Sequence, residues 1–260
     1  MTIKEKGATG QPKRSRFAFT LAEVLITLGI IGIVAAMTIP TLTQRYREKV
    51  LINRLKDTYS IFSQAYKLAV NEYDSPEGWD IGEKASHDGA VKVYNYFKPF
   101  LKLGQDCGEE YGCFASSYST FSGVEYGFAP YGHPLYARGV LMNGVAFAFA
   151  SAGSGCSVYE DEPQYGDYCA MLYIDVNGYD LPNKTGIDYF GFIITPTGVV
   201  PLGRPDDKGL GNGYTCTYKG KNSGNGTGCT AYVLKRGNMD YLRRDISNDW
   251  KWNIFVFPNV

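Results

Sequence analysis

The chain has 260 residues, of which 44% are apolar and 20% are charged, so it is not a disordered protein and can form one sizeable core. Basic and acidic side chains balance at 26 each. Because the formal net charge is zero, nothing draws the chain as a whole to nucleic acid, and no nucleic-acid partner is expected.

The first 18 residues differ from the rest of the chain in charge. They carry a single acid, Glu5, against five basic side chains, so the remainder holds 21 basic and 25 acidic side chains. We interpret residues 1–18 as a separate basic leader. Its basic residues are Lys4, Lys6, Lys13, Arg14 and Arg16.

An apolar segment follows the leader. Residues 19–42 would span roughly 36 Å as a helix, and the hydrocarbon core of a bilayer is about 30 Å thick. Glu23 is the only ionisable residue in the segment. Since the basic residues precede it, the positive-inside rule predicts a single-pass anchor with its N-terminus in the cytoplasm and the rest of the chain outside.

Three kinds of N-terminal segment fit this pattern. The first is a secretory signal peptide cut near the small residues 34–36, the second is a plain signal anchor, and the third is a prepilin leader. A carboxylate inside an apolar span costs about 2–3 kcal/mol at the bilayer centre, and neither of the first two gains anything from it. Glu23 therefore favours the third.

Residues 18–25, AFTLAEVL, resemble the processing site of type IV prepilins and type II secretion pseudopilins, which reads small residue, Phe, Thr, Leu, variable residue, Glu. The resemblance implies cleavage between Ala18 and Phe19 by a prepilin peptidase and methylation of the new Phe19 amine by its methyltransferase. The family usually has Gly where this chain has Ala18. Because alanine is also small, we still expect cleavage.

The resemblance also implies assembly with other pilin or pseudopilin subunits into a filament. In such a filament the carboxylate of Glu23 would neutralise the Phe19 amine of a neighbouring subunit, which offsets the desolvation of both charges. Pro40 falls at mature position 22, where type IV pilins often carry a proline that breaks the helix during assembly. We expect the helix to break there during assembly.

The helix is expected to continue beyond the membrane. Residues 44–73 contain no Pro or Gly, and apolar residues recur there at spacings of three and four, which predicts an amphipathic continuation packed on the head. Asp74-Ser75-Pro76 predicts its end. The expected organisation is a leader at 1–18, a long helix at 19–73 with its transmembrane part at 19–42, and an exported head at 74–260.

The head is expected to be α+β and pilin-like, with the long helix packed on an antiparallel sheet. Residues 88–98 predict a second helix that ends before Pro99. Strand-like runs occupy residues 139–150, 171–176, 190–195 and 199–200.

Six cysteines lie on the exported side of the apolar segment. None forms a C-x-x-C pair, which argues against zinc or thioredoxin-like sites, and their even number favours disulfides in an oxidising compartment. Fifteen pairings exist, and sequential pairing is the first expectation because each loop is then short. In chain order they are Cys107, Cys113, Cys156, Cys169, Cys216 and Cys229.

Residues 173–203 resemble the sheet region of pilin-like heads. The oxygen-bearing residues Asp175, Asn177, Asp180 and Asp188 gather there, and such ligands suit calcium, which some pseudopilin heads bind. The spacing is not that of an EF-hand. The favoured alternative is an Asn177-Gly178 turn with side chains that cap the backbone, so no cofactor is expected beyond this calcium hypothesis.

Catalytic motifs are lacking in the sequence, which contains only two histidines, His87 and His133, and no nucleophile-elbow, zincin or Walker sequence. We therefore expect a non-enzymatic filament subunit that starts in the bacterial inner membrane and moves to a filament or the cell surface. The alternative from another class is a monomeric, membrane-anchored exported enzyme or ligand-binding protein.

Overall fold

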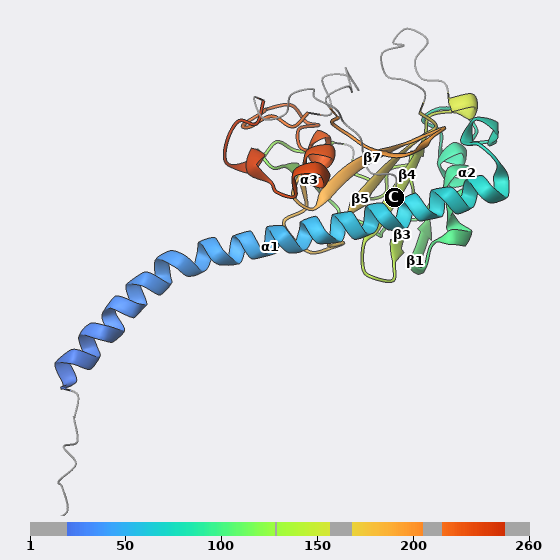
Figure 1. Ribbon diagram of the computed structural model, residues 1–260. Coiled ribbons are helices and arrows are strands. Elements are labelled where there is room, and N and C mark those ends of the chain that lie inside the picture. The colour runs from blue at the N-terminus through green and yellow to red at the C-terminus, as the bar shows by residue number, and fades with distance from the viewer. Residues whose placement is uncertain (1–19, 128, 157–167, 205–214, 248–260) are drawn as a thin grey trace, which may run out of the picture. The chain divides into compact units, whose positions relative to one another are not determined.

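The computed structural model describes residues 20–127, 129–156, 168–204 and 215–247 (Figure 1). The chain divides into two compact units, residues 1–45 and residues 46–260. The division falls within the first helix, between its membrane-type half and the half that belongs to the head. The expectations at Ala18 and Phe19 lie outside the described residues.

Helix α1 runs from Leu21 to Tyr73 without interruption. Pro40 lies inside it, and α1 is continuous there in this single chain, so a helix break at Pro40 during assembly stays a prediction. Proline removes one main-chain hydrogen bond and its ring crowds the carbonyl four residues earlier, so the turn before Pro40 is weakened. The helix ends as expected, because Asp74 takes a left-handed φ of 61° and Pro76 follows in a short turn.

The head contains one eight-stranded sheet, with seven strands in the order β1-β3-β4-β5-β7-β6-β2 and β8 paired to β7. The central pairs are antiparallel, but β2 and β6 pair in parallel, and so do β6 and β7, so the sheet is mixed and not purely antiparallel as expected. Both exceptions involve two-residue strands contributed by long loops. The strands are β1 (Leu103–Gly108), β2 (Ser119–Thr120), β3 (Ala137–Leu141), β4 (Ala146–Ser151), β5 (Ala170–Asp175), β6 (Lys184–Thr185), β7 (Tyr189–Thr195) and β8 (Gly198–Pro201).

The run at 139–150, expected as one strand, forms the hairpin of β3 and β4. Gly144 takes a φ of 82° in the turn, which is a conformation that glycine adopts without strain. The Asn143-Gly144 dipeptide is a hairpin signal that the strand prediction overlooked. Arg54 of α1 donates a hydrogen bond to the Asn143 carbonyl at 3.0 Å and ties this turn to the helix.

One face of the sheet is covered by residues 46–73 of α1 and by α2 (His87–Phe97) (Figure 1). Phe62 lies between Phe147 and Phe149, with ring centroids 5.3 and 6.0 Å away. Alternate residues of β4 point to this face, as the period of a strand requires. The apolar stripe predicted within residues 44–73 is thus buried, at Leu55, Phe62, Ala65 and Ala69 among others, and the α+β, pilin-like architecture is confirmed.

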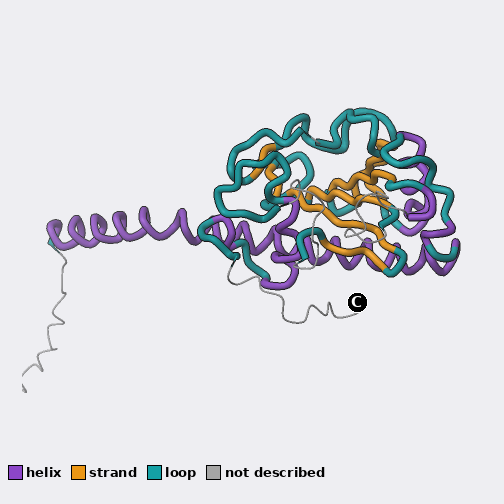
Figure 2. Tube along the Cα trace, turned by 90° about the horizontal axis from the view of Figure 1, so that it is seen from above, coloured by secondary structure: helices purple, strands orange, loops and turns teal. Residues whose placement is uncertain are grey.

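Among the described residues, long loops cover the opposite face (Figure 2). Tyrosine rings dominate this second core, and Tyr189 at its centre contacts four aromatic rings within 6.3 Å. Arg138 is also fully buried here, and its guanidinium donates to the carbonyls of Glu109, Glu110 and His133. These bonds hold two of the covering loops in place.

The C-terminal part of the described chain packs on the first helix. It contains α3 (Thr230–Arg236), which was not predicted, and a short turn at Asp240–Leu242. The Arg243 guanidinium pairs with the Glu48 carboxylate of α1, near the start of the head unit. This ion pair links the two ends of the head unit's described sequence.

Candidate functional site

The start of α1 is closed by reciprocal hydrogen bonds between Thr20 and Glu23. The Glu23 carboxylate accepts from the Thr20 backbone N–H at 2.9 Å and from its hydroxyl at 2.8 Å, and the Glu23 N–H donates to the Thr20 hydroxyl at 3.2 Å. This is a capping box, which satisfies main-chain donors at the helix start. The T-x-x-E spacing could have identified Thr20 from sequence.

Apolar side chains cover the first half of α1 and are exposed in this chain. Residues 21–42 include Leu25, Ile31 and Met37, each more than 60% exposed. Within the described residues α1 is the one helix that is long and apolar enough to cross a membrane. Such a surface is expected to be covered by lipid or by other helices.

Three threonines in and just after this segment bond to their own helix. The hydroxyls of Thr27, Thr38 and Thr43 donate to main-chain carbonyls three or four residues earlier, each at 2.9 Å. A hydroxyl bonded to its own helix enters hydrocarbon at low cost, because no donor is left unpaired. Glu23 therefore remains the single ionisable group in the apolar segment.

The cysteines form three disulfides in sequential order. Cys107 joins Cys113, Cys156 joins Cys169, and Cys216 joins Cys229, with no cysteine left free. Their sequence separations are 6, 13 and 13 residues. Each bridge thus joins two cysteines that are close in the sequence.

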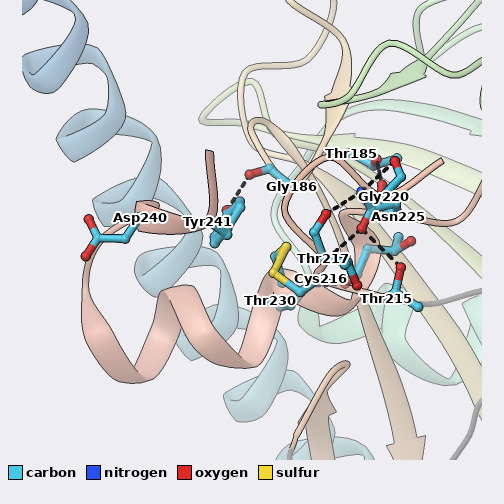
Figure 3. Close-up of a disulfide and its surroundings, with 12 residues drawn as sticks. Thr185, Gly186, Thr215, Cys216, Thr217, Gly220, Asn225, Thr230, Asp240 and Tyr241 are labelled. Atoms are coloured by element: carbon cyan, nitrogen blue, oxygen red, sulfur yellow. Dashed lines mark hydrogen bonds between the residues drawn. A yellow bond between two sulfur atoms is a disulfide. The ribbon is translucent and has the colours of Figure 1, made fainter. Parts of the chain in front are cut away.

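Asn225 organises the loop closed by the third disulfide (Figure 3). Its carboxamide oxygen accepts from the Thr215 hydroxyl at 3.0 Å and from the Thr217 N–H at 2.9 Å. Its amide nitrogen donates to the carbonyls of Thr217 and Gly220 at 3.0 and 3.2 Å. The Thr185 hydroxyl donates to the Asn225 carbonyl at 2.5 Å, so the loop is fixed to β6 by a fully buried side chain.

Asp175 ends β5 and is fully buried. Its carboxylate accepts from the Tyr118 hydroxyl at 2.5 Å and from the Asn177 N–H at 3.1 Å. Burial, together with the negative charge of Asp188, raises the pKa of Asp175 well above its usual range. Burial and the Asp175 charge also raise the pKa of Tyr118, which keeps its hydroxyl a donor.

Asp188 is the second buried carboxylate of this turn region. It accepts from the backbone N–H groups of Asn183 at 2.8 Å and Lys184 at 2.6 Å, and burial raises its pKa to about 6. Asp180 is exposed, and its carbonyl accepts from the Asn177 side chain at 2.9 Å. The structure therefore brings Asp175 and Asp188 together but leaves the Asp180 side chain outside.

These contacts favour a turn in which side chains cap the backbone over a calcium site. Both oxygens of Asp175 and both oxygens of Asp188 already accept a hydrogen bond from the chain. In the part of the chain that the structure describes, no group of three or more His, Cys, Asp and Glu side chains could hold a metal ion. Calcium at these residues stays a prediction.

The two histidines occupy separate environments. The His87 ring lies 3.7 Å from the Glu109 carboxylate, and the ring nitrogen of His133 accepts from the Leu135 N–H. Neither contact includes a nucleophile of the kind that a hydrolase would use. The histidines therefore supply no argument for catalysis.

Two family models match the chain, one over the head and one over the N-terminal segment. Residues 41–251 match a family of unknown function, DUF6613. The chain belongs to the DUF6613 family. Residues 13–39 of this DUF6613 protein match the prokaryotic N-terminal methylation motif, so they carry the prepilin-type signal of type IV pilins and pseudopilins. No curated protein and no solved structure matched the chain significantly.

Proposed function

We propose that this DUF6613 protein is a prepilin, cleaved between Ala18 and Phe19, methylated at Phe19, and assembled into a type IV pilus or a type II secretion pseudopilus. The observation that carries the proposal is the N-terminal methylation motif, placed at the start of a helix whose apolar surface is uncovered. A motif that directs cleavage before the apolar segment leaves that segment in the mature protein. The protein is then a structural subunit and not an enzyme.

The membrane orientation follows from the charge of the leader. Residues 1–18 are basic, so they remain in the cytoplasm while residues 19–42 cross the inner membrane and the head lies outside. Three disulfides in the head suit the oxidising compartment on that side. Prepilin peptidase and its methyltransferase are the proposed processing partners, and other pilin-type subunits are the proposed assembly partners.

A minor or tip position in the filament fits the size of the head. The 187 residues after Tyr73 make a large unit for a subunit repeated along a whole filament. We therefore place the protein among the less abundant subunits.

Mass spectrometry of the membrane-extracted protein tests the proposal. Loss of residues 1–18 with one added methyl group on Phe19 is expected, and Ala18→Gly should be processed at least as well. A mature N-terminus at Met37 would instead indicate ordinary secretion, as for the alternative exported enzyme or ligand-binding protein. An intact leader in a host with active prepilin peptidase would contradict the proposal.

A further inference from the structure

A small pocket lies in the head beside the C-terminal end of α1. Its volume is about 350 Å³, and it is lined by Tyr73, Asp80, Lys92, Asn95 and Tyr96. This size is at the lower end of the range of roughly 300–1,000 Å³ for pockets that bind small molecules. The lining combines aromatic rings with a few polar side chains, which is the composition of a ligand site.

Two tyrosine rings form the apolar walls of this pocket. The rings of Tyr73 and Tyr96 meet at 76° with centroids 5.3 Å apart. Behind them Tyr96 stacks on the buried Trp79 at 4.4 Å and 10°. The Trp79 indole N–H donates to the carbonyls of Tyr73 and Asp74, so the walls are held by the end of α1 and are preorganised.

The charged side chains of the pocket, Lys92 and Asp80, are held by contacts within the head. The Lys92 ammonium lies 3.1 Å from Asp80 and 2.9 Å from Asp88, and the Asp80 N–H donates to the Tyr96 hydroxyl oxygen at 3.2 Å. Within the described residues, the Asn95 carboxamide and the Tyr73 hydroxyl have no hydrogen-bond partner. These two groups are therefore available to a ligand.

The charges at the pocket select the class of ligand. Lys92 is already balanced by two carboxylates, so the site offers no surplus positive charge to a phosphate or a carboxylate. It offers aromatic walls for an apolar face, and an amide and hydroxyls for neutral polar groups. A pyranose has an apolar C–H face and a rim of hydroxyls.

We propose that this pocket binds a neutral carbohydrate, with one pyranose face packed on the Tyr73 and Tyr96 rings and sugar hydroxyls bonded to the Asn95 carboxamide and the Tyr73 hydroxyl. The proposal does not depend on the proposed filament role, because a carbohydrate site on an exported head serves a pilin and a monomeric binding protein alike.

Saturation-transfer NMR on the full-length chain tests this site. The protein is kept in micelles of lauryldimethylamine oxide, because maltoside detergents present sugar headgroups that would compete. Maltotriose, chitotriose and lactose are the probes. When the aromatic protons are saturated, we expect transfer to the ring C–H protons of at least one probe.

Two variants then locate the site. Tyr73→Ala removes one wall, and Asn95→Ala removes an exposed carboxamide on α2 that no protein group uses, so the latter preserves the fold. Each should weaken binding at least tenfold, while Tyr179→Ala, which removes an exposed tyrosine in another loop, should leave it unchanged. Absence of transfer to all three probes, or binding that survives both pocket variants, would overturn the proposal. If the wild type binds none of the sugars and Asn95→Ala no longer enters filaments, the pocket contacts a neighbouring subunit. That result would also overturn the carbohydrate proposal.

Discussion

Both hydrogen bonds that Glu23 accepts from Thr20 end on the same carboxylate oxygen, Oε2, at 2.9 and 2.8 Å. Among the described residues no hydrogen bond ends on the other oxygen. One carboxylate can therefore close its own helix start and still receive an amine from a neighbouring subunit. The capping bond and the proposed assembly contact are compatible.

Two replacements of Glu23 distinguish its role as a helix cap from its proposed role in a charge pair. Glu23→Val removes both, and Glu23→Gln keeps a capping acceptor but removes the charge. Because a more apolar span inserts more readily, both variants should be cleaved and inserted normally. Both should be lost at least tenfold from sheared filament fractions, as measured by immunoblotting.

Thr27→Val is the matched control, because it removes a polar group of the same span whose hydroxyl bonds only to its own helix. It should assemble at the wild-type level. If Glu23→Gln assembles normally while Glu23→Val does not, the residue acts as a cap and the proposed ion pair is wrong.

The third disulfide, Cys216–Cys229, is predicted to stabilise the head. A bridge that closes a loop of 13 residues contributes about 3 kcal/mol by constraining the unfolded chain. We expect the double variant Cys216→Ser/Cys229→Ser to lose about that much free energy of unfolding in urea. Non-reducing peptide mapping of the wild type should recover the three sequential bridges, and any crossed pairing would contradict the structure.

The buried Asp188 predicts a pH-dependent stability. Its folded pKa is raised to about 6, whereas an unfolded aspartate ionises near pH 4. Between these values the unfolded chain releases a proton that the folded chain retains, so the free energy of unfolding falls as pH rises from 4 to 6. The fall attributable to this residue is about 3 kcal/mol.

Urea unfolding at pH 4, 5, 6 and 7 measures this effect as the difference between the wild type and Asp188→Asn. Asp180→Asn, at an exposed position of the same region, is the control and should follow the wild type. A wild-type stability advantage that stays constant or grows from pH 4 to 6 would show that Asp188 ionises normally in the folded chain.

Calcium provides a fourth test. Since the oxygens of Asp175 and Asp188 already accept hydrogen bonds from the chain, we expect the melting temperature to be the same in 1 mM calcium chloride and in EDTA. A calcium-dependent rise that disappears in Asp175→Asn would instead establish a metal site at this turn.

Much of the N-terminal half was predictable because its signals are local. The capping box joins residues three apart, the hydroxyls of Thr27 and Thr38 bond within one helical turn, and the end of α1 depends on the residues that follow Tyr73. The periodic stripe on residues 51–69 needs only the geometry of one helix. The short disulfide loops are local in the same sense.

The sequence by itself therefore determined the basic leader, the apolar helix with its one carboxylate, and an α+β head with paired cysteines. Only the tertiary structure decided the parallel pairing of β2 with β6 and the burial of Arg138 under two loops. It also decided the edge-to-face contact between the Tyr73 and Tyr96 rings. These contacts join residues far apart in the chain or depend on which face of the sheet each loop covers. Their formation depends on the burial and hydrogen bonding of the whole head, which no local pattern encodes.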